Sequence, residues 1–280
     1  MSFREELIPQ LEAFYTLPAE ALGDEARAAF DSFRDALEKG QLRAAQPGPD
    51  GWTVNAWVKK AILLGFRLGR FMEMDPAGPL QFFDKDTFPP QRLSAERNVR
   101  VVPGGTAIRS GAYVAPGVVI MPPAYINVGA YVDAGTLIDS HALVGSCAQI
   151  GKRVHLSAGA QIGGVLEPVG ALPVVIEDDV LVGGNCGVYE GAIVGSRAVL
   201  GAGVILTGSV TVYDLPKKTT YRRQGGEPLR IPEAAVVVPG ARRLLDSFAE
   251  RNGLSLYTPV IVKYRDDKTE ASAALEDALR

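Results

Sequence analysis

Three side chains that can exchange protons lie within one short stretch of the chain: Asp139, His141 and His155. A carboxylate can orient an ammonium group and accept its proton, and histidine is a common general base near neutral pH. These residue types favour chemistry in which an amine loses a proton and attacks an electrophile. The chain contains only two histidines, so it does not supply the three-histidine set of a typical catalytic zinc site, and no metal site is predicted.

A six-residue repeat surrounds these residues and must position them. Every sixth residue over 108–162 is aliphatic, and the same register resumes over 176–212. The residue four positions after each aliphatic one is small or β-branched. A period of six fits neither a helix nor an ordinary strand. It is the hexapeptide signature of a parallel β-helix, in which three hexapeptides form one triangular coil.

This architecture fixes which side chains point outwards. The aliphatic residues form ladders inside the prism, and small residues and glycines fit its corners. Hexapeptide helices of this kind wind left-handed, an exception to the usual right-handed crossover of parallel strands. Asp139 directly follows the predicted core residue Ile138, so its side chain is expected to project from the prism. Tyr113, Tyr125 and Tyr131 each precede a core residue, and their outward rings suit either a subunit interface or surface packing.

The rest of the chain predicts a mainly β protein with three parts. Residues 1–98 form an N-terminal α-helical domain and a linker, with apolar residues at helical spacing over 26–37 and 56–67. The proline-rich stretch 75–98 is expected to be irregular and to lie over the first coil. The left-handed parallel β-helix then covers 99–215.

Two departures from the repeat mark the remaining regions. The register fails at 164–175, where we expect an insert loop that leaves one corner of the prism and faces the binding site. Residues 216–280 form a small C-terminal extension. It is expected to hold a helical turn over 241–250, a strand over 258–264 and a closing helix or tail over 269–280.

Composition narrows the partners and the compartment. The net charge of −3 provides no basic surface for nucleic acid or an anionic membrane, and no apolar run approaches membrane-spanning length. The N-terminus lacks a signal-peptide pattern. Cys147 and Cys186 both fall inside the repeat, where buried reduced thiols are expected. These features predict a cytoplasmic protein.

Several sequence blocks resemble the tetrahydrodipicolinate N-succinyltransferase family of lysine and diaminopimelate biosynthesis. Blocks outside the repeat make the resemblance specific, because many acyltransferases share a bare hexapeptide repeat. The similar blocks are 57–61 (WVKKA), 83–85 (FDK), 99–103 (VRVVP), 129–133 (GAYVD), 144–151 (VGSCAQIG), 163–168 (GGVLEP), 255–257 (SLY) and 260–263 (VIVK).

The resemblance implies a reaction and an assembly. It implies transfer of a succinyl group from succinyl-CoA, as co-substrate and without a tightly bound cofactor, to the amine of the ring-opened substrate L-2-amino-6-oxopimelate. It also implies a homotrimer with active sites between neighbouring β-helices. The substrate is a dicarboxylate, so cationic or amide donors must meet it.

The family pattern also implies site residues. Arg100 matches a substrate-binding arginine, and Asp139 matches an aspartate at the substrate amine. The well-studied branch carries a glutamate where this chain has Gly187, and that glutamate works together with the aspartate. We therefore consider Glu190 as a catalytic substitute and Glu167, from the insert, as a substrate-binding one.

Coenzyme A is expected to lie along a groove of the β-helix. Its pantetheine would meet the backbone at the small residues Gly183, Gly201 and Ala202. Its phosphates need cations, for which Lys263 and Lys268 are the candidates, with Arg222 or Arg223 as alternatives.

Two other functions stay open at this point. An acetyltransferase acting on the same substrate from acetyl-CoA would share the prism and part of the insert motif. A non-catalytic β-helix that serves as a scaffold would need none of the site residues.

Overall fold

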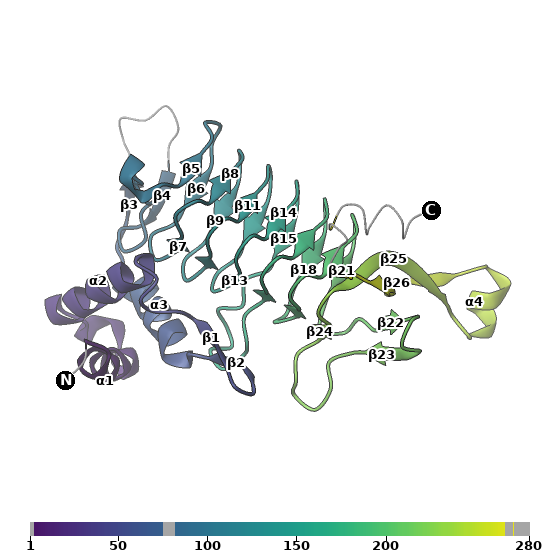
Figure 1. Cartoon of the computed structure of the whole chain (residues 1–280). Helices are drawn as coiled ribbons and strands as arrows, with labels where there is room; N and C mark the ends of the chain where they lie inside the picture. Colours follow the sequence, from purple (N-terminus) through teal and green to yellow (C-terminus); the bar gives the residue numbers. More distant parts are fainter. Residues whose placement is uncertain (1–2, 75–81, 267–270, 272–280) are drawn as a thin grey trace.

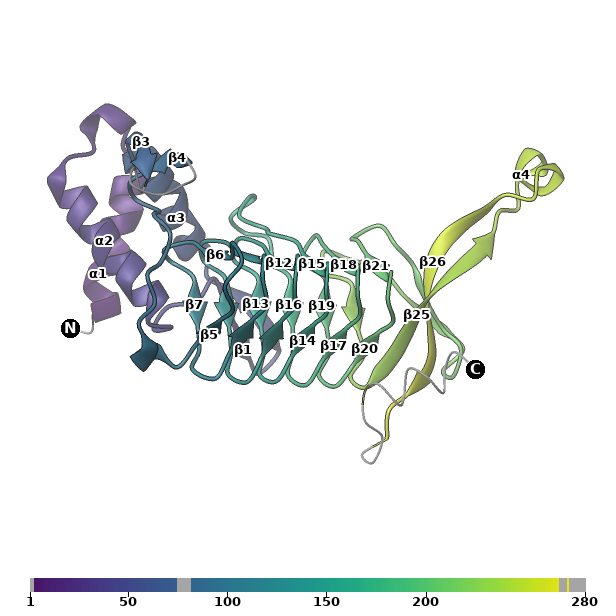
Figure 2. The same ribbon diagram turned by 90° about the horizontal axis from the view of Figure 1, so that it is seen from above.

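The computed structural model describes residues 3–74, 82–266 and 271, and its centre is a left-handed parallel β-helix. Its coils stack in a row between helices α1 to α3 at one end and the long β25–β26 hairpin at the other (Figure 1). Seen from above, the hairpin carries α4 at its tip and projects away from the prism (Figure 2). No helix in the described part of the chain is both long and apolar enough to cross a membrane.

Three sheets form the faces of the prism, and each face is named here after its first strand. The β5 face contains β5 (Arg100–Val101), β8 (Val119–Ile120), β11 (Leu137–Ile138), β14 (His155–Leu156), β17 (Leu181–Val182), β20 (Val199–Leu200) and β25 (Ala235–Arg243). The β6 face contains β6 (Ala107–Ile108), β9 (Tyr125–Ile126), β12 (Leu143–Val144), β15 (Gln161–Ile162), β18 (Gly187–Val188) and β21 (Ile205–Leu206). The β7 face contains β7 (Tyr113–Val114), β10 (Tyr131–Val132), β13 (Gln149–Ile150), β16 (Val175–Ile176), β19 (Ile193–Val194) and β24 (Arg230–Ile231).

The register of the strands confirms the hexapeptide pattern. Leu137 pairs in parallel with Val119 on one side and with His155 on the other, one coil away in each direction. The second residue of each short strand points inwards, and Ile138 and Val188 are completely buried in the core of the prism. The first residue points outwards, so the side chains of successive coils form parallel rows on each face.

The N-terminal domain is helical and packs on the prism. It contains α1 (Phe3–Thr16), α2 (Asp24–Glu38) and α3 (Ala56–Leu68), with a 3-10 turn (Ala19–Ala21) and the hairpin β1 (Ala45–Gly48) and β2 (Gly51–Val54). Its core is built around Phe30, Phe33 and Ile62, and it includes Val128 and Cys147 from the β-helix. The two regions therefore share one continuous apolar contact.

Two of the three outward tyrosines lie under this domain. The guanidinium of Arg43 lies 3.6 Å from the ring centre of Tyr131, whose ring centre is 4.6 Å from that of Tyr113. A Cβ on Gly40 would lie 2.8 Å from the Tyr113 ring, so the chain after α2 also closes over this face. Tyr113 and Tyr131 thus belong to the contact between domains within one chain, whereas Tyr125 is exposed.

The stretch after α3 is more regular than its sequence indicates. β3 (Phe71–Met74) pairs antiparallel with β4 (Phe82–Lys85), where an irregular segment was expected. The strands are four residues long and mostly exposed, so their pairing leaves little trace in the sequence. Beyond the 3-10 turn Ala95–Arg97 the first coil begins, and the backbone of Gln91 bonds to Ile108 across that coil, as predicted.

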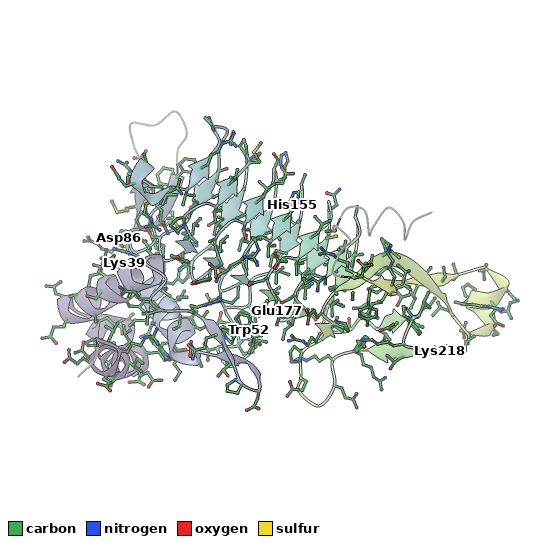
Figure 3. The ribbon with its side chains drawn as sticks, in the orientation of Figure 1. Lys39, Trp52, Asp86, His155, Glu177 and Lys218 are labelled. Atoms are coloured by element: carbon green, nitrogen blue, oxygen red, sulfur yellow. The ribbon has the colours of Figure 1, made fainter. Side chains whose placement is uncertain are left out.

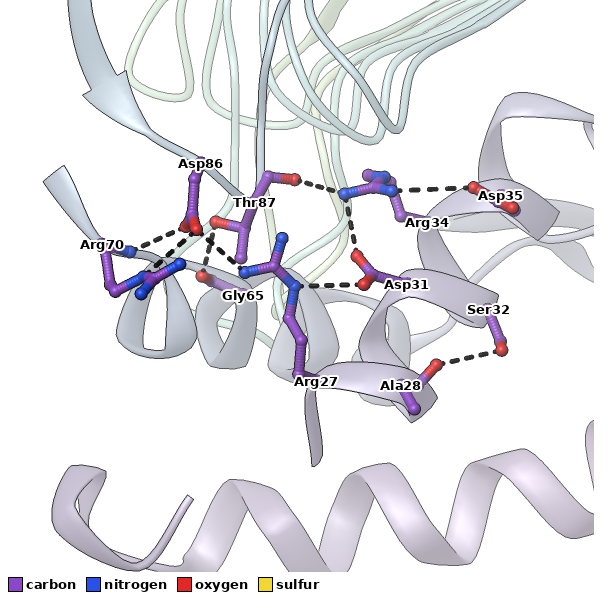
Figure 4. A network of polar contacts seen from close by, with 10 residues as sticks. All are labelled: Arg27, Ala28, Asp31, Ser32, Arg34, Asp35, Gly65, Arg70, Asp86 and Thr87. Carbon is purple, nitrogen blue, oxygen red and sulfur yellow. Dashed lines mark hydrogen bonds and ion pairs between the residues drawn. The ribbon is translucent and has the colours of Figure 1, made fainter. Parts of the chain in front are cut away.

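A polar network fastens the segment after β4 to the helices (Figure 4). Asp86 accepts hydrogen bonds from Arg27 at 3.1 Å and from the backbone of Arg70 at 2.8 Å, and Thr87 donates to the carbonyl of Gly65 at 2.9 Å. Burial opposes ionisation of Asp86, but these bonds hold the pKa of its carboxyl below the usual value. This network sets the direction in which the chain enters the first coil.

The prism continues past residue 215, where the sequence pattern appeared to end. After β22 (Val212–Asp214) and β23 (Thr219–Tyr221) the chain returns, and β24 and β25 pair in parallel with β19 and β20. Ile231 and Val237 fill the core as hexapeptide residues do. The segment between β21 and β24 interrupts the six-residue spacing in the sequence. In space, β24 and β25 still pair with the strands of the preceding coil.

The C-terminal extension differs from the prediction in its helix. Residues 241–243 belong to β25 and pair with β26 (Ser255–Tyr264), and only α4 (Ser247–Arg251) is helical. Residues 241–243 form strand hydrogen bonds with 255–257, and this pairing overrides the helical pattern of the local sequence. The predicted segment 269–280 lies outside the described residues except for Ala271.

Candidate active site

Asp139 lies at the corner between the β5 and β6 faces, called here the β5/β6 corner. Its side chain is one-third exposed, since Ile138 before it points into the core. One carboxylate oxygen, Oδ1, accepts a hydrogen bond of 2.7 Å from the backbone N–H of Ser140. The second oxygen is therefore free to face a ligand while the first fixes the orientation of the carboxylate.

The histidine beside Asp139 is His155. His155 stands on β14, directly next to β11, and its Nε2 lies 4.0 Å from Oδ2 of Asp139. This nitrogen is shielded from solvent and has no hydrogen-bond partner among the described residues. His141 is nearer in sequence, but it occupies an exposed corner position with a left-handed backbone (φ 62°). The one-coil spacing of 18 residues, visible in the pairing of Leu137 with His155, is the signal that could have identified this neighbour.

Arg100 lies on the same face as this pair. Its strand β5 is separated from β11 by β8 alone, so Arg100 and Leu137 stand about 10 Å apart along the face. Arg100 is exposed. The structure thus places Arg100 and His155 in one outward row of the β5 face, with Asp139 at the adjoining corner.

Gly183, Gly201 and Ala202 occupy the same β5/β6 corner in later coils. Gly183 and Gly201 are buried, and their N–H groups donate to Leu200 and Val237 of the next coil, whereas Ala202 is exposed. A Cβ on Gly183 would lie 2.6 Å from the backbone nitrogen of Ala202, so coil stacking alone requires glycine there. Contact of these residues with a ligand stays a prediction.

Of the two predicted phosphate-binding lysines, the structure places Lys263, at the far end of the β5 face. Lys263 is on β26, half-buried, opposite Val236 in the antiparallel ladder. Lys268 lies outside the described residues.

A groove of about 1140 Å³ opens at a different edge, the β6/β7 corner. Its walls are the β1–β2 hairpin, the insert loop after β15, the corner after β18 and the C-terminal segment that includes Arg223 and Arg230. Lys59, completely buried on α3, anchors the insert by donating a hydrogen bond of 2.5 Å to the carbonyl of Ala171. The insert therefore does line a cavity, as the sequence predicts.

Both candidate glutamates lie at this groove rather than near Asp139. Glu167 is an exposed residue of the insert. Glu190 has a left-handed backbone (φ 54°), and its Oε2 accepts a hydrogen bond of 2.7 Å from the N–H of Gly208 in the next coil. Within one chain, Asp139 and Glu190 are on different corners and two coils apart, so the structure does not bring them together.

Glu177 joins two walls of the groove, the β1–β2 hairpin and the segment with Arg230, to the corner after β19. Its Oε1 accepts hydrogen bonds from Nε1 of Trp52 at 3.0 Å and from Arg230 at 2.9 Å, and its Oε2 accepts one from the backbone of Ser196 at 3.0 Å. Figure 3 shows Trp52 and Glu177 together, with His155 on another strand row of the prism. The sequence gives no sign of this junction, because its members are far apart in the chain.

The two cysteines are part of the packed interior. Cys147 and Cys186 are unpaired and buried, as expected, and burial raises the pKa of the Cys147 thiol to about 12 and that of Cys186 to about 11. No cluster of three or more potential metal ligands is present within residues 3–74, 82–266 and 271.

Comparison with known proteins covers nearly the whole chain. Residues 10–68 match the family model of the tetrahydrodipicolinate N-succinyltransferase N-terminal region, and residues 173–208 match the hexapeptide repeat of succinyl-transferase. A 2,3,4,5-tetrahydropyridine-2,6-dicarboxylate N-succinyltransferase of Nitrobacter hamburgensis is 43% identical over 278 residues, covering 96% of this chain and 95% of that protein. One from an Azoarcus species is 47% identical, covering 87% of this chain and 86% of that protein.

Solved structures include one with the same fold. A crystal structure from Campylobacter jejuni, titled as a 2,3,4,5-tetrahydropyridine-2-carboxylate N-succinyltransferase, superposes with a TM-score of 0.58 at 17% identity. The superposition covers 90% of this chain and 64% of that one, and at this identity it supports the fold alone.

Proposed function

The chain belongs to the tetrahydrodipicolinate N-succinyltransferase family, and from this we propose that it transfers a succinyl group from succinyl-CoA to the amine of L-2-amino-6-oxopimelate in lysine and diaminopimelate biosynthesis. The observation that carries the proposal is the 43% identity to a relative of that name over 96% of the chain, the N-terminal domain included. The use of a CoA thioester in amino-acid biosynthesis supports our proposal that the protein acts in the cytoplasm.

Asp139 is the proposed proton acceptor. The amine must be neutral to attack the thioester carbonyl carbon, and the proton it loses needs a nearby base. The N–H of Ser140 fixes Oδ1 of Asp139, which leaves Oδ2 to accept a hydrogen bond from the amine. A C–N bond then forms, the C–S bond breaks, and coenzyme A leaves as the thiol after taking up a proton.

Arg100 is the proposed partner of a substrate carboxylate. It is exposed on the β5 face, and its backbone lies about 10 Å from that of Leu137, two residues before Asp139 at the adjoining corner. The substrate carries carboxylates at both ends of a seven-carbon chain, so a cation at this distance from the amine site is useful. Arginine binds carboxylates with paired hydrogen bonds.

Coenzyme A is proposed to lie along the β5/β6 corner. This corner runs from Asp139 towards Gly183, Gly201 and Ala202 in successive coils, and Lys263 stands near its far end. An extended thioester laid along it would bring its acyl end to Asp139 and its phosphates to the C-terminal segment.

A homotrimer is the proposed assembly. In one chain, Asp139 and the groove residues Glu167 and Glu190 belong to different corners of the prism. A site that uses both corners must therefore be built from two copies, as the family resemblance implies. Light scattering on a sizing column gives the mass directly, and a monomer of 29.8 kDa that is fully active would contradict this assembly.

A donor assay tests the function. Purified protein is mixed with the acceptor and with either succinyl-CoA or acetyl-CoA, and thiol release is followed. We expect kcat/KM for succinyl-CoA to exceed that for acetyl-CoA by at least tenfold. The reverse preference would make the protein an acetyltransferase, and no turnover together with no binding of either thioester would favour a scaffold.

A substitution tests the mechanism. Asp139→Asn keeps the shape of the side chain but cannot accept the proton, so we expect kcat to fall by at least 100-fold with the assembly intact. Asp133→Asn, at the outward position that follows β10, is the matched control and should retain normal turnover.

A further inference from the structure

Tyr189 covers the outer surface of Gly187. A Cβ on Gly187 would lie 2.4 Å from Cε2 and 2.8 Å from the hydroxyl oxygen of Tyr189. A Cβ on Gly163, one coil earlier, would lie 2.7 Å from Cδ1 of the same ring. The ring therefore folds back from the β6/β7 corner across the β6 face, with its hydroxyl end over Gly187.

Burial on this face supports that placement. The outward residues of the other five strands of the β6 face are half-buried or exposed, among them Gln161 and Ile205 on either side of Gly187. On the β6 face, Gly187 alone among the six outward strand residues is buried, and it has no side chain that could contribute to its own burial. Its cover is the Tyr189 ring.

The two glycines have no backbone reason to be glycine. Neither Gly163 nor Gly187 has a positive φ, so any residue could adopt their conformations. At both positions a Cβ would come within 3.0 Å of the ring, so the ring would have to move to admit a side chain. The Tyr189 ring packs directly against the backbone of both glycines, beside the groove that Tyr189 also lines.

We propose that the Tyr189 hydroxyl oxygen accepts a hydrogen bond from the amine of the bound acyl acceptor, at the place where the family resemblance leads one to expect a carboxylate on residue 187. This inference rests on the proposed function. A tyrosine hydroxyl oxygen can accept this hydrogen bond and orient the amine, but it does not take a proton from an ammonium group. Proton acceptance is thereby left to Asp139 alone.

Glu190 is the competing candidate, and its contacts argue against it. Its Oε2 accepts the hydrogen bond from Gly208, and a Cβ on Gly208 would lie 2.6 Å from that oxygen. Glu190 thus connects two coils at the corner. Tyr189 instead presents its hydroxyl on the outer face beside the groove.

Tyr189 would meet Asp139 of another copy. The two residues of one chain belong to different corners, and β12 and β18, which adjoin them, are two strands apart on the β6 face. That is about 10 Å along the axis in addition to the width of the face. A single amine can contact both only at a junction between two chains.

The first test removes the hydroxyl and keeps the ring. Tyr189→Phe should lower kcat by at least tenfold while circular dichroism, assembly mass and thermal midpoint stay unchanged. Tyr213→Phe, an exposed tyrosine on β22 outside the groove, is the control and should act as wild type. If Tyr189→Phe keeps kcat and KM within twofold while Asp139→Asn is inactive, the tyrosine inference is overturned and the proposed function stands. If the wild-type protein does not transfer succinyl groups, the proposed function itself fails.

A second test exchanges the two positions. Gly187→Glu alone should be inactive, because its side chain collides with the ring. The double variant Gly187→Glu with Tyr189→Val removes the ring and supplies a carboxylate, and it should recover at least tenfold over Tyr189→Val alone. Equal activities of Tyr189→Val and the double variant would contradict the idea that both side chains serve one position.

A third test locates the partner of Asp139. Co-expressed Asp139→Asn and Tyr189→Phe chains should give mixed trimers in which about a quarter of the shared sites combine two wild-type residues. Activity near a quarter of the wild-type value, well above that of either parent, is expected. Activity no higher than the mean of the parents would place both residues in one chain and overturn the inference.

Discussion

Nε2 of His155 lies 4.0 Å from Oδ2 of Asp139, across the two neighbouring strands β11 and β14. The nitrogen is shielded and otherwise unpaired within the described residues, while the other carboxylate oxygen is held by Ser140. A small movement of the His155 ring would bring Nε2 within hydrogen-bond distance of Oδ2 of Asp139. Such a bond would hold this oxygen of the proposed base in one orientation. We propose that His155 positions Asp139, because in the proposed mechanism the carboxylate is the group that meets the amine.

Replacing His155 is expected to impair turnover more than binding. In His155→Leu the free oxygen of Asp139 loses its neighbour and samples more orientations, so we expect kcat to fall by about threefold to tenfold, with KM for the acceptor within twofold. Steady-state kinetics measures both. His141→Leu, at an exposed corner position two residues from Asp139, is the control and should retain full activity. An unchanged kcat in His155→Leu would remove the histidine from the mechanism.

Replacing Glu177 is expected to destabilise the walls of the groove. In Glu177→Ala, Trp52, Arg230 and Ser196 all lose their acceptor, and hydrogen bonds to a charged group contribute about 1.5–3 kcal/mol each. Water can replace part of these hydrogen bonds in the variant. We therefore expect the free energy of unfolding, measured by urea denaturation, to fall by about 2 kcal/mol. Glu233→Ala, an exposed acid in the same region, should change it by less than about 0.5 kcal/mol. A loss no larger than that of the control would mean that the junction does not stabilise the fold.

Alkaline pH is expected to destabilise the protein through its cysteines. Burial raises the thiol pKa of Cys147 to about 12 and of Cys186 to about 11, from 9.0 when exposed. The unfolded chain therefore loses these protons first, so the folded state binds more protons and stability falls as pH rises above about 9. Urea unfolding at pH 8 and pH 10 should show this decline, and Cys147→Ala with Cys186→Ala should make it shallower. An identical decline in that variant would assign it to other groups.

Lys59 contributes with the opposite sign. Burial lowers the pKa of its ammonium from 10.5, so between the lowered value and 10.5 the unfolded chain binds the extra proton. Stability therefore rises with pH through that window, and the cost of the buried charge is largest below it. Lys59→Met should abolish this rise, measured as the difference in unfolding free energy from wild type at successive pH values.

The neighbouring residue supplies the control for that experiment. Lys60 lies on the same helix but forms a surface ion pair with Glu12 at 3.0 Å. Lys60→Met should keep the pH dependence of the wild type. If both variants behaved alike, the burial of Lys59 would have no measurable effect on stability.

The fold was predictable because it repeats. Each aliphatic residue, such as Ile138 or Val188, occupies the same environment as its neighbours in the coils above and below. A pattern read over a few residues therefore predicts the structure of the whole prism. The prediction lost accuracy where pairing was not local. The strand β4 depends on β3, and β24 rejoins β19 only after a long excursion.

The site was predictable in part. The outward direction of Asp139 follows from its place after Ile138, and the shared corner of Asp139, Gly183 and Gly201 follows from the coil period. His155 was recorded as a candidate, but its contact with Asp139 was not recognised because 16 residues separate them in sequence. Lys263 and the groove depend on the fold-back of the C-terminal segment, which no periodicity encodes.

The six-residue pattern alone predicts the prism, the inward ladder of aliphatic residues and the outward direction of Asp139, because a strict period leaves one solution for burying its apolar positions. Three contacts were visible only in the folded chain: Tyr189 lies over Gly187, His155 adjoins Asp139, and Glu177 joins three distant segments. The contacts of His155 and Glu177 join residues of different coils or domains, and the Tyr189 ring also reaches Gly163 in the preceding coil. Such contacts depend on how loops and side chains fold over the frame, and the repeat does not specify them.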